Sequence, residues 1–372
     1  MTVSSVETYH TKQRYNQLSQ FIKATFPNQL IRIESLPGDA SFRRYHRIYL
    51  EGLDNNGNGN DKVQVQDIAQ LDPILDPSYI VMDAPPQLES IESFVRINTL
   101  MISKINVPSL FAEDMDQGFL ILQDFGSIEF AHLIAEAKVK QDSGRINDLY
   151  RWAIDSLIHL QALDIAEAKN KFNVPDYDAA TLQREMELFT EWFLPYIDQP
   201  LDSETTAIWQ NFTHALIEQL LQQPQVVVHR DYHSRNLMQD QYHIRELGVI
   251  DFQDALIGSY TYDLVSLVRD AYVDWSEAEV DSWIEYFWQQ CKSYNKATPD
   301  NLKQFTTQVN LMGVQRHLKV LGIFVRLSER DGKTRYLSDI PKVWQDLMVE
   351  MIWLNEHADE KIKTFIQPAL RW

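Results

Sequence analysis

The stretch that decides the fold is VVVHRDYHSRN, residues 226–236, together with GVIDF, residues 248–252. In both stretches an apolar run of β-forming residues leads directly into ionisable or amide side chains. The first run is followed by Asp231 and, five residues later, by Asn236; the second is followed by Asp251. We therefore expect two buried strands that bring three oxygen-bearing side chains to one place.

Oxygen ligands of this kind are suited to phosphoryl transfer. A carboxylate and an amide are hard donors that Mg²⁺ accepts, its other ligands being water and nucleotide phosphates. A further carboxylate can orient an attacking hydroxyl group and take its proton. Asp231 fits the base, and Asn236 and Asp251 fit the metal. The structural alternative, in which these residues form turns and caps around a core histidine, does not explain why they follow two apolar runs.

The rest of the chain divides into a β-rich first third and a helical remainder. Strands are expected at 30–33, 45–50, 79–82 and 119–122, a first helix at 86–105, and later helices at 146–168, 179–193 and 203–222. The pattern predicts an α+β, bilobal protein with a β-rich N-terminal lobe, residues 1–124, and a mostly helical C-terminal lobe, residues 125–372. A cleft between two lobes is a common place for a binding site.

Composition restricts the partners. At 372 residues the chain is too long for a single compact core. Its 34 basic and 53 acidic residues give a net charge of −19, which repels the phosphate backbone of nucleic acids. There is one cysteine, Cys291, and we find neither a secretory leader nor a long uncharged apolar span. We expect a cytoplasmic monomer that binds neither nucleic acid nor membrane.

The sequence resembles the aminoglycoside-phosphotransferase and choline-kinase superfamily, which has the protein-kinase-like fold. Besides residues 228–236 and 248–251, the resemblance rests on LPGDASFRRY (36–45), VMDAPP (81–86), GSYTYDLVSLVRD (258–270) and QRHLKVLG (315–322). These segments are most similar to the anomeric sugar kinases of bacterial cell-wall recycling. The resemblance implies ATP as donor, Mg²⁺ as cofactor and a small-molecule sugar as acceptor, phosphorylated at the C1 hydroxyl of N-acetylmuramate or N-acetylglucosamine.

The resemblance also implies roles for individual residues. Asp231 corresponds to the catalytic base, and Asn236 and Asp251 to the metal ligands. The loop over the nucleotide phosphates corresponds to Gly38, Asp39, Ala40 and Ser41, and the hinge that holds adenine to Gln123, Asp124 and Phe125. Backbone N–H groups of a glycine-containing loop can bind phosphate oxygens. An ordinary hairpin turn and an ordinary strand end are the alternatives for these two segments.

One departure from the family pattern concerns the third strand. Related kinases carry a phosphate-binding lysine there, but residues 79–86 contain none. Arg43 or Arg44 is a candidate source of the missing charge, whereas Glu89 and Glu92 are expected to be solvated helix residues.

Three further residues are candidates for substrate binding. Arg235 lies inside the catalytic loop, Asp254 follows Asp251 closely, and Arg316 can bind a sugar carboxylate through its guanidinium fork. A helix cap at Asp254 and a solvated basic face around Arg316 are the alternatives. Asp263 is expected to support the catalytic loop structurally.

Two other functions compete with an amino-sugar kinase. The first is a kinase of another small alcohol, of the aminoglycoside, choline or homoserine type. The second is a non-catalytic pseudokinase, which the missing lysine suggests. The presence of Asp231, Asn236 and Asp251 together argues against the pseudokinase.

Overall fold

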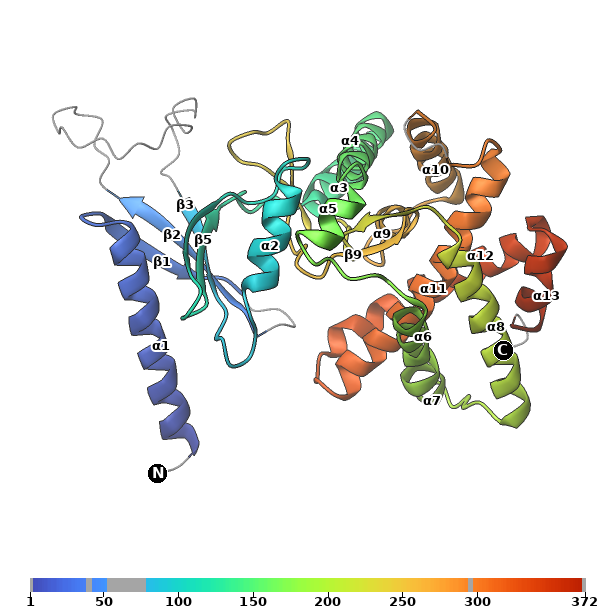
Figure 1. The fold of residues 1–372 in the computed structure, drawn as a ribbon, viewed down its shortest axis with the longest axis horizontal. Coiled ribbons are helices and arrows are strands. Elements are labelled where there is room, and N and C mark those ends of the chain that lie inside the picture. Colours follow the sequence, from blue (N-terminus) through green and yellow to red (C-terminus); the bar gives the residue numbers. More distant parts are fainter. Residues whose placement is uncertain (1–2, 38–41, 52–77, 294–296, 370–372) are drawn as a thin grey trace. The chain divides into compact units, whose positions relative to one another are not determined.

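The computed structural model describes residues 3–37, 42–51, 78–293 and 297–369, and they form two compact units (Figure 1). The first unit contains residues 1–102, 106–128 and 238–250, and the second contains residues 103–105, 129–237 and 251–372. Residues 238–250 therefore group with the first unit, although the residues directly before them, 229–237, belong to the second. The expected phosphate loop, Gly38 to Ser41, lies outside the described residues.

The first unit is built on a five-stranded sheet in the order β1-β2-β3-β5-β4. Its strands are β1 (Leu30–Ser35), β2 (Arg44–Glu51), β3 (Ser78–Asp83), β4 (Leu110–Asp114) and β5 (Phe119–Gln123), and all neighbouring strands are antiparallel. The four expected strands are confirmed. Strand β4 is not expected from the sequence, because its apolar residues are few and it lies at the edge of the sheet, half exposed.

Two helices accompany this sheet. In α1 (Val3–Thr25), Leu18 and Ile22 pack with Ile48 and Val81 of the sheet in one apolar core. Helix α1 is not among the elements expected from the sequence. The expected helix 86–105 is shorter in the structure, where α2 is Glu92–Met101. The residues before α2 form a turn instead, in which the amides of Leu88 and Glu89 donate to the carbonyl of Pro85.

The second unit is mostly helical. Its α-helices are α3 (Phe130–Val139), α4 (Ser143–Gln161), α5 (Ile165–Asn170), α6 (Ala179–Leu188), α7 (Leu194–Tyr196), α8 (Ser203–Leu221), α9 (Tyr262–Val268), α10 (Glu277–Cys291), α11 (Leu302–Glu329), α12 (Ile340–His357) and α13 (Glu360–Ala369). A π-helical turn, Phe189–Phe193, follows α6, and a 3₁₀ helix, Thr334–Asp339, precedes α12. The expected helix 146–168 is two helices, because Asp164 caps the start of α5.

Two short sheets contain the strands next to residues 229–236 and 250–252. β6 (Gln225–Val228) pairs antiparallel with β9 (Leu256–Ser259), and β7 (Leu237–Gln239) pairs with β8 (Leu247–Val249). The long helix α11 packs against α6, α9 and α12 within the second unit (Figure 1). Of the helices that the structure describes, none is both long and apolar enough to cross a membrane.

Candidate functional site

The site begins at the end of β6. Val227 and Val228 are fully buried, and β6 is held in place by its pairing with β9. The chain then leaves the sheet as a loop, residues 229–236, in which His229 is buried while Asp231 and Asn236 are half-buried. An apolar strand thus anchors a polar loop in which Asp231 and Asn236 are partly exposed.

The structure links the three residues that the sequence analysis grouped. The Asn236 side-chain amide donates to the backbone carbonyl of Asp231 at 2.9 Å and lies 3.5 Å from a carboxylate oxygen of Asp251. The other Asp251 oxygen accepts from the Gln253 side chain at 2.9 Å. Asn236 therefore bridges two segments that are separated by more than a dozen residues in the sequence.

The donors in this group fit a divalent cation. Asp251 is exposed and Asn236 is half-buried, and their side chains lie next to each other. Carboxylate and amide oxygens are both ligands that Mg²⁺ accepts. Within the described part of the chain no group of three or more His, Cys, Asp or Glu side chains could hold a metal. A cation at this site would therefore take further ligands from water or from a bound phosphate.

Two residues of the site have left-handed backbone conformations. Arg230 has a φ of +77° and Asp251 a φ of +66°. In residues other than glycine this conformation costs about 1–2 kcal/mol, and it persists where surrounding contacts enforce it. Such conformations cluster at functional sites, and here they occur directly before the expected base and at an expected metal ligand.

The start of the loop is held by Asp263. Its buried carboxylate accepts hydrogen bonds from the backbone amides of His229, at 2.6 Å, and Arg230, at 2.9 Å. Burial raises the pKa of Asp263 in spite of these bonds and of the nearby His229. The expectation that Asp263 supports this loop structurally is confirmed.

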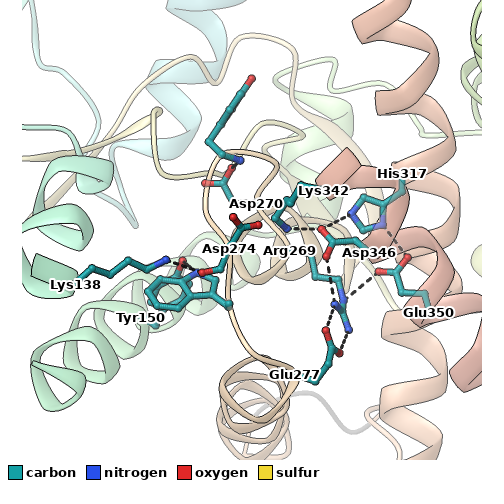
Figure 2. Close-up of polar contacts among 12 residues, drawn as sticks. Lys138, Tyr150, Arg269, Asp270, Asp274, Glu277, His317, Lys342, Asp346 and Glu350 are labelled. Carbon is teal, nitrogen blue, oxygen red and sulfur yellow. Dashed lines mark hydrogen bonds and ion pairs between the residues drawn. The ribbon is translucent and has the colours of Figure 1, made fainter. Parts of the chain in front are cut away.

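The far end of the loop is held by Asp270, which accepts from the amide of Ser234 at 2.9 Å. The preceding residue, Arg269, is buried among acidic side chains (Figure 2). It donates to Glu277 at 2.7 Å and lies 3.3 Å from Glu350. Glu350 also contacts His317, at 2.8 Å. Burial raises the pKa of Glu350 and lowers the pKa of His317 to about 3.

A cluster of charged residues lies behind Asp231. Arg316 and Lys319 of α11 are both buried, and both donate to the Tyr262 hydroxyl, at 3.3 Å and 3.0 Å. Burial by itself would raise the pKa of Asp231, but the nearby side chains of Lys319, His233 and Arg316 outweigh it and lower that pKa. The Asp231 carboxylate is therefore charged at neutral pH, as a base must be before it accepts a proton.

The three expected substrate-binding residues lie in different surroundings. Arg235 is exposed, with its guanidinium carbon 3.4 Å from the centroid of the Tyr272 ring. Asp254 is exposed as well. Arg316 is buried, and its guanidinium donates to the Arg230 carbonyl and the Tyr262 hydroxyl, so it is not part of a solvated basic face.

The expected adenine hinge follows β5 in the first unit. The Asp124 side chain is buried and accepts from Arg47 at 2.6 Å and Ser78 at 2.8 Å. The carbonyls of Asp124 and Phe125 accept from the side chain and the backbone of Gln241, at 2.8 Å and 3.0 Å. The side-chain amide of Gln123 donates a hydrogen bond to the Asp240 carboxylate at 3.2 Å. These contacts hold the turn after β5 in a defined shape.

Phe125 also explains a glycine of the second motif. A Cβ atom at Gly248 would lie 2.5 Å from the Phe125 ring, so a larger residue would push the ring away.

One of the two arginines considered as a substitute for the lysine that β3 lacks, Arg43, forms an ion pair. Arg43 pairs with Glu89, and both side chains are largely buried. The expectation that Glu89 is a solvated helix residue is therefore wrong: it lies before α2 and is bound by an arginine. Glu92 is exposed at the start of α2, as expected.

Sequence reasoning missed Glu185, which pairs with both Arg230 and Lys319. A signal for it exists in the sequence. Leu182, Glu185 and Met186 have the i, i+3, i+4 spacing of the buried face of α6, and a charge on such a face requires a partner.

Comparison with known proteins identifies the family. Residues 32–301 match the phosphotransferase enzyme family. The N-acetylmuramate/N-acetylglucosamine kinase of Pseudomonas aeruginosa is 35% identical over 346 residues, which cover 90% of this chain and 91% of the relative. The kinase of the same name from Pseudomonas putida is 39% identical over 309 residues, covering 82% of this chain and 79% of the relative.

A solved structure, an ADP-bound aminoglycoside phosphotransferase, has a TM-score of 0.54 at 12% identity and covers 91% of this chain and 98% of its own. That likeness concerns the fold alone, and it confirms the expected α+β, kinase-like architecture. Because the family match extends over more than half of the chain and the two relatives are similar over most of their length, the protein belongs to the phosphotransferase enzyme family.

Proposed function

We propose that this phosphotransferase is an ATP-dependent kinase that phosphorylates N-acetylmuramate or N-acetylglucosamine at the anomeric hydroxyl. The compounds are those in the names of the two relatives, which are 35% and 39% identical to the chain. The observation that carries the proposal is the linked group of Asp231, Asn236 and Asp251 at the exits of two buried strands. This group contains the base and the oxygen donors that phosphoryl transfer needs.

The proposed reaction is a direct in-line transfer. The C1 hydroxyl oxygen attacks the γ-phosphorus, the bond from that phosphorus to the β,γ-bridging oxygen breaks, and Asp231 accepts the hydroxyl proton. Asn236 and Asp251 would hold Mg²⁺, which, when bound, neutralises charge that develops on the phosphates. No phosphoenzyme is required, because the acceptor itself is the nucleophile.

ATP is proposed to bind through backbone groups of residues 38–41 and 123–125. Arg43, paired with Glu89, or Arg44, exposed at the start of β2, would supply the positive charge that β3 lacks. Replacing each arginine in turn by methionine distinguishes them: the residue that contacts phosphate raises the KM for ATP when it is replaced. An unchanged KM in both variants would contradict this assignment.

On the acceptor side, Arg235 and Asp254 are proposed to contact the sugar, since both are exposed and close in sequence to the proposed catalytic residues. Their replacement by methionine and asparagine should raise the KM for the sugar more than the KM for ATP. An equal effect on both constants would contradict this role.

A coupled assay of ADP release against four acceptors tests the proposed function. We expect turnover with N-acetylmuramate and N-acetylglucosamine, little with choline or kanamycin, and none in the Asp231→Asn variant. Turnover with choline or kanamycin alone would make the protein a kinase of another small alcohol. No turnover with any of these acceptors would favour a non-catalytic role.

A second measurement tests the anomeric position. Methyl glycosides of the same sugars have no free C1 hydroxyl, so they should not react, and the product of the free sugars should lose its reducing end. Phosphorylation of a methyl glycoside would place the transfer at another hydroxyl group.

A further inference from the structure

Arg230 is held by residues of three helices, through its backbone amide, its carbonyl and its side chain. Its amide donates to Asp263 of α9, and its carbonyl accepts from Arg316 of α11 at 3.1 Å. Its guanidinium pairs with Glu185 of α6. Three helices thus converge on the one residue of this loop that precedes the proposed base and has a positive φ, +77°.

The position of Arg230 decides where Asp231 lies. The two residues share a peptide bond, so a rotation of Arg230 toward the ordinary negative φ would swing the Asp231 carboxylate to a new place. A misplacement of about 1 Å can cost a reaction about 10²-fold. An unsupported arginine would prefer the ordinary conformation, because the left-handed one is unfavourable for side chains with a Cβ.

Glu185 is itself firmly placed. Its side chain is largely buried and accepts hydrogen bonds from the Tyr177 hydroxyl and from Gln315, the latter at 3.3 Å. Lys319 lies 3.2 Å away and supplies a second positive charge. A buried carboxylate with this many partners is costly to move.

We propose that Glu185 and Arg316 are positioning residues, which together with Asp263 enforce the left-handed backbone of Arg230 and thereby place the Asp231 carboxylate for catalysis. The activity readout of this inference rests on the proposed kinase function. The assignment replaces the expectation from sequence that Arg316 binds a substrate carboxylate, because its guanidinium is buried against the Arg230 carbonyl and the Tyr262 hydroxyl.

Two substitutions at Arg230 separate positioning from a direct side-chain role. Both Arg230→Gly and Arg230→Ala remove the guanidinium, but only glycine adopts a positive φ without penalty. We expect kcat to stay within about threefold of the wild type in Arg230→Gly and to fall about tenfold in Arg230→Ala, with the KM for ATP unchanged in both. Equal losses of kcat in the two variants would overturn the inference.

The contribution of Glu185 is tested by a double-mutant cycle. We expect Glu185→Gln to lower kcat about tenfold in the wild type and to have little effect in the Arg230→Gly background, where no conformation needs to be enforced. The same loss in both backgrounds would overturn the inference. Glu167→Gln, which breaks the exposed ion pair of Glu167 with Lys171 on the same unit, is the matched control and should leave kcat unchanged.

Two further measurements keep the test decisive. Hydrogen exchange of the amides in residues 229–236 should be faster in Glu185→Gln than in the wild type and in Glu167→Gln, and unchanged exchange would count against the inference. The exchange measurement does not depend on the acceptor. If the wild-type protein phosphorylates neither amino sugar, the proposed function is refuted, but the positioning role can still be tested by hydrogen exchange. If Glu185→Gln does not fold, Glu185→Asp, which keeps the charge one methylene further back, takes its place.

Discussion

The loop after β6 and the turn after β5 have the same design in sequence, an apolar strand followed by polar residues, but the structure uses them differently. After β5, the Asp124 side chain is 1% exposed and is bound by Arg47 of β2 and Ser78 of β3. After β6, the supporting carboxylates come from distant residues, Asp263 and Asp270. The loop's own Asp231 and Asn236 therefore remain half-buried.

This difference in hydrogen-bond partners indicates which polar side chains at a strand end can take part in chemistry. The Asp124 carboxylate is occupied by Arg47, by Ser78 and by the amide of Gly126 in its own turn. After β6, Asp263 and Asp270 bind the loop amides, so the Asp231 carboxylate is not needed for that purpose. Substitutions in the two regions should accordingly have different effects, on catalysis after β6 and on stability after β5.

The largest expected effect is that of Asp231→Asn. Loss of a general base should lower kcat about 10³-fold, while ATP still binds and the melting temperature stays close to that of the wild type. Steady-state kinetics, ATP-binding calorimetry and thermal unfolding measure the three quantities. Substantial residual turnover in a correctly folded variant would remove Asp231 from the proposed role.

Arg269→Met tests the support at the far end of the loop. It leaves Glu277 and Glu350 without their guanidinium, and removing one partner of a buried ion pair costs about 3–5 kcal/mol. Urea unfolding should show this loss of free energy. The exposed pair of Arg330 with Asp331 provides the control, because Arg330→Met should not change the unfolding midpoint. A wild-type unfolding midpoint for Arg269→Met would contradict a stabilising role for the ion pairs of Arg269 with Glu277 and Glu350.

Asp124→Asn tests the turn after β5. The variant keeps an acceptor but loses the charge that binds Arg47, so we expect a loss of about 1–3 kcal/mol in the free energy of unfolding. Because the proposed contact with adenine uses the backbone, kcat at saturating ATP should remain within about threefold of the wild type. A large fall in kcat with unchanged stability would erase the distinction between the two regions.

The smallest expected effect concerns pH. Burial opposes ionisation of Glu185, but Lys319 and Arg230 outweigh it and hold its pKa below the usual 4.5. As the pH falls, the unfolded chain therefore takes up this proton before the folded chain does, and the stabilisation is lost as the pH falls through the lowered pKa. The difference in unfolding free energy between the wild type and Glu185→Gln should be constant near neutral pH and shrink in acid. A difference that grows in acid would contradict the sign.

Local sequence patterns predicted much of the fold. Strands β1, β2, β3 and β5 are runs of apolar residues bounded by polar or turn residues. They can therefore be predicted from the local sequence without tertiary information. The helix α1 was missed because its apolar positions are few, and its fit to the sheet depends on long-range contacts such as Arg14 with Asp83. The start of α2 was misplaced because proline is compatible both with a first helical turn and with the turn that forms.

The candidate site divides in the same way. The sequence pointed to Asp231, Asn236 and Asp251 because each lies a few residues after a strand. The end of a strand is recognisable in the sequence as an apolar run followed by polar residues. Glu185 and the burial of Arg316 were not found, because their partner Arg230 lies 45 and 86 residues away.

The sequence alone predicted the residues that are proposed for phosphoryl transfer, and it determined that a β-rich part precedes a helical one, because strand runs and motif spacing are local properties. Only the tertiary structure decided that the Asp124 carboxylate is bound by Arg47 and Ser78 and that residues of three helices hold Arg230, which precedes Asp231. Burial and left-handed backbone conformations are enforced by contacts between distant segments, and hydrogen bonds across such distances leave no periodic trace in the sequence.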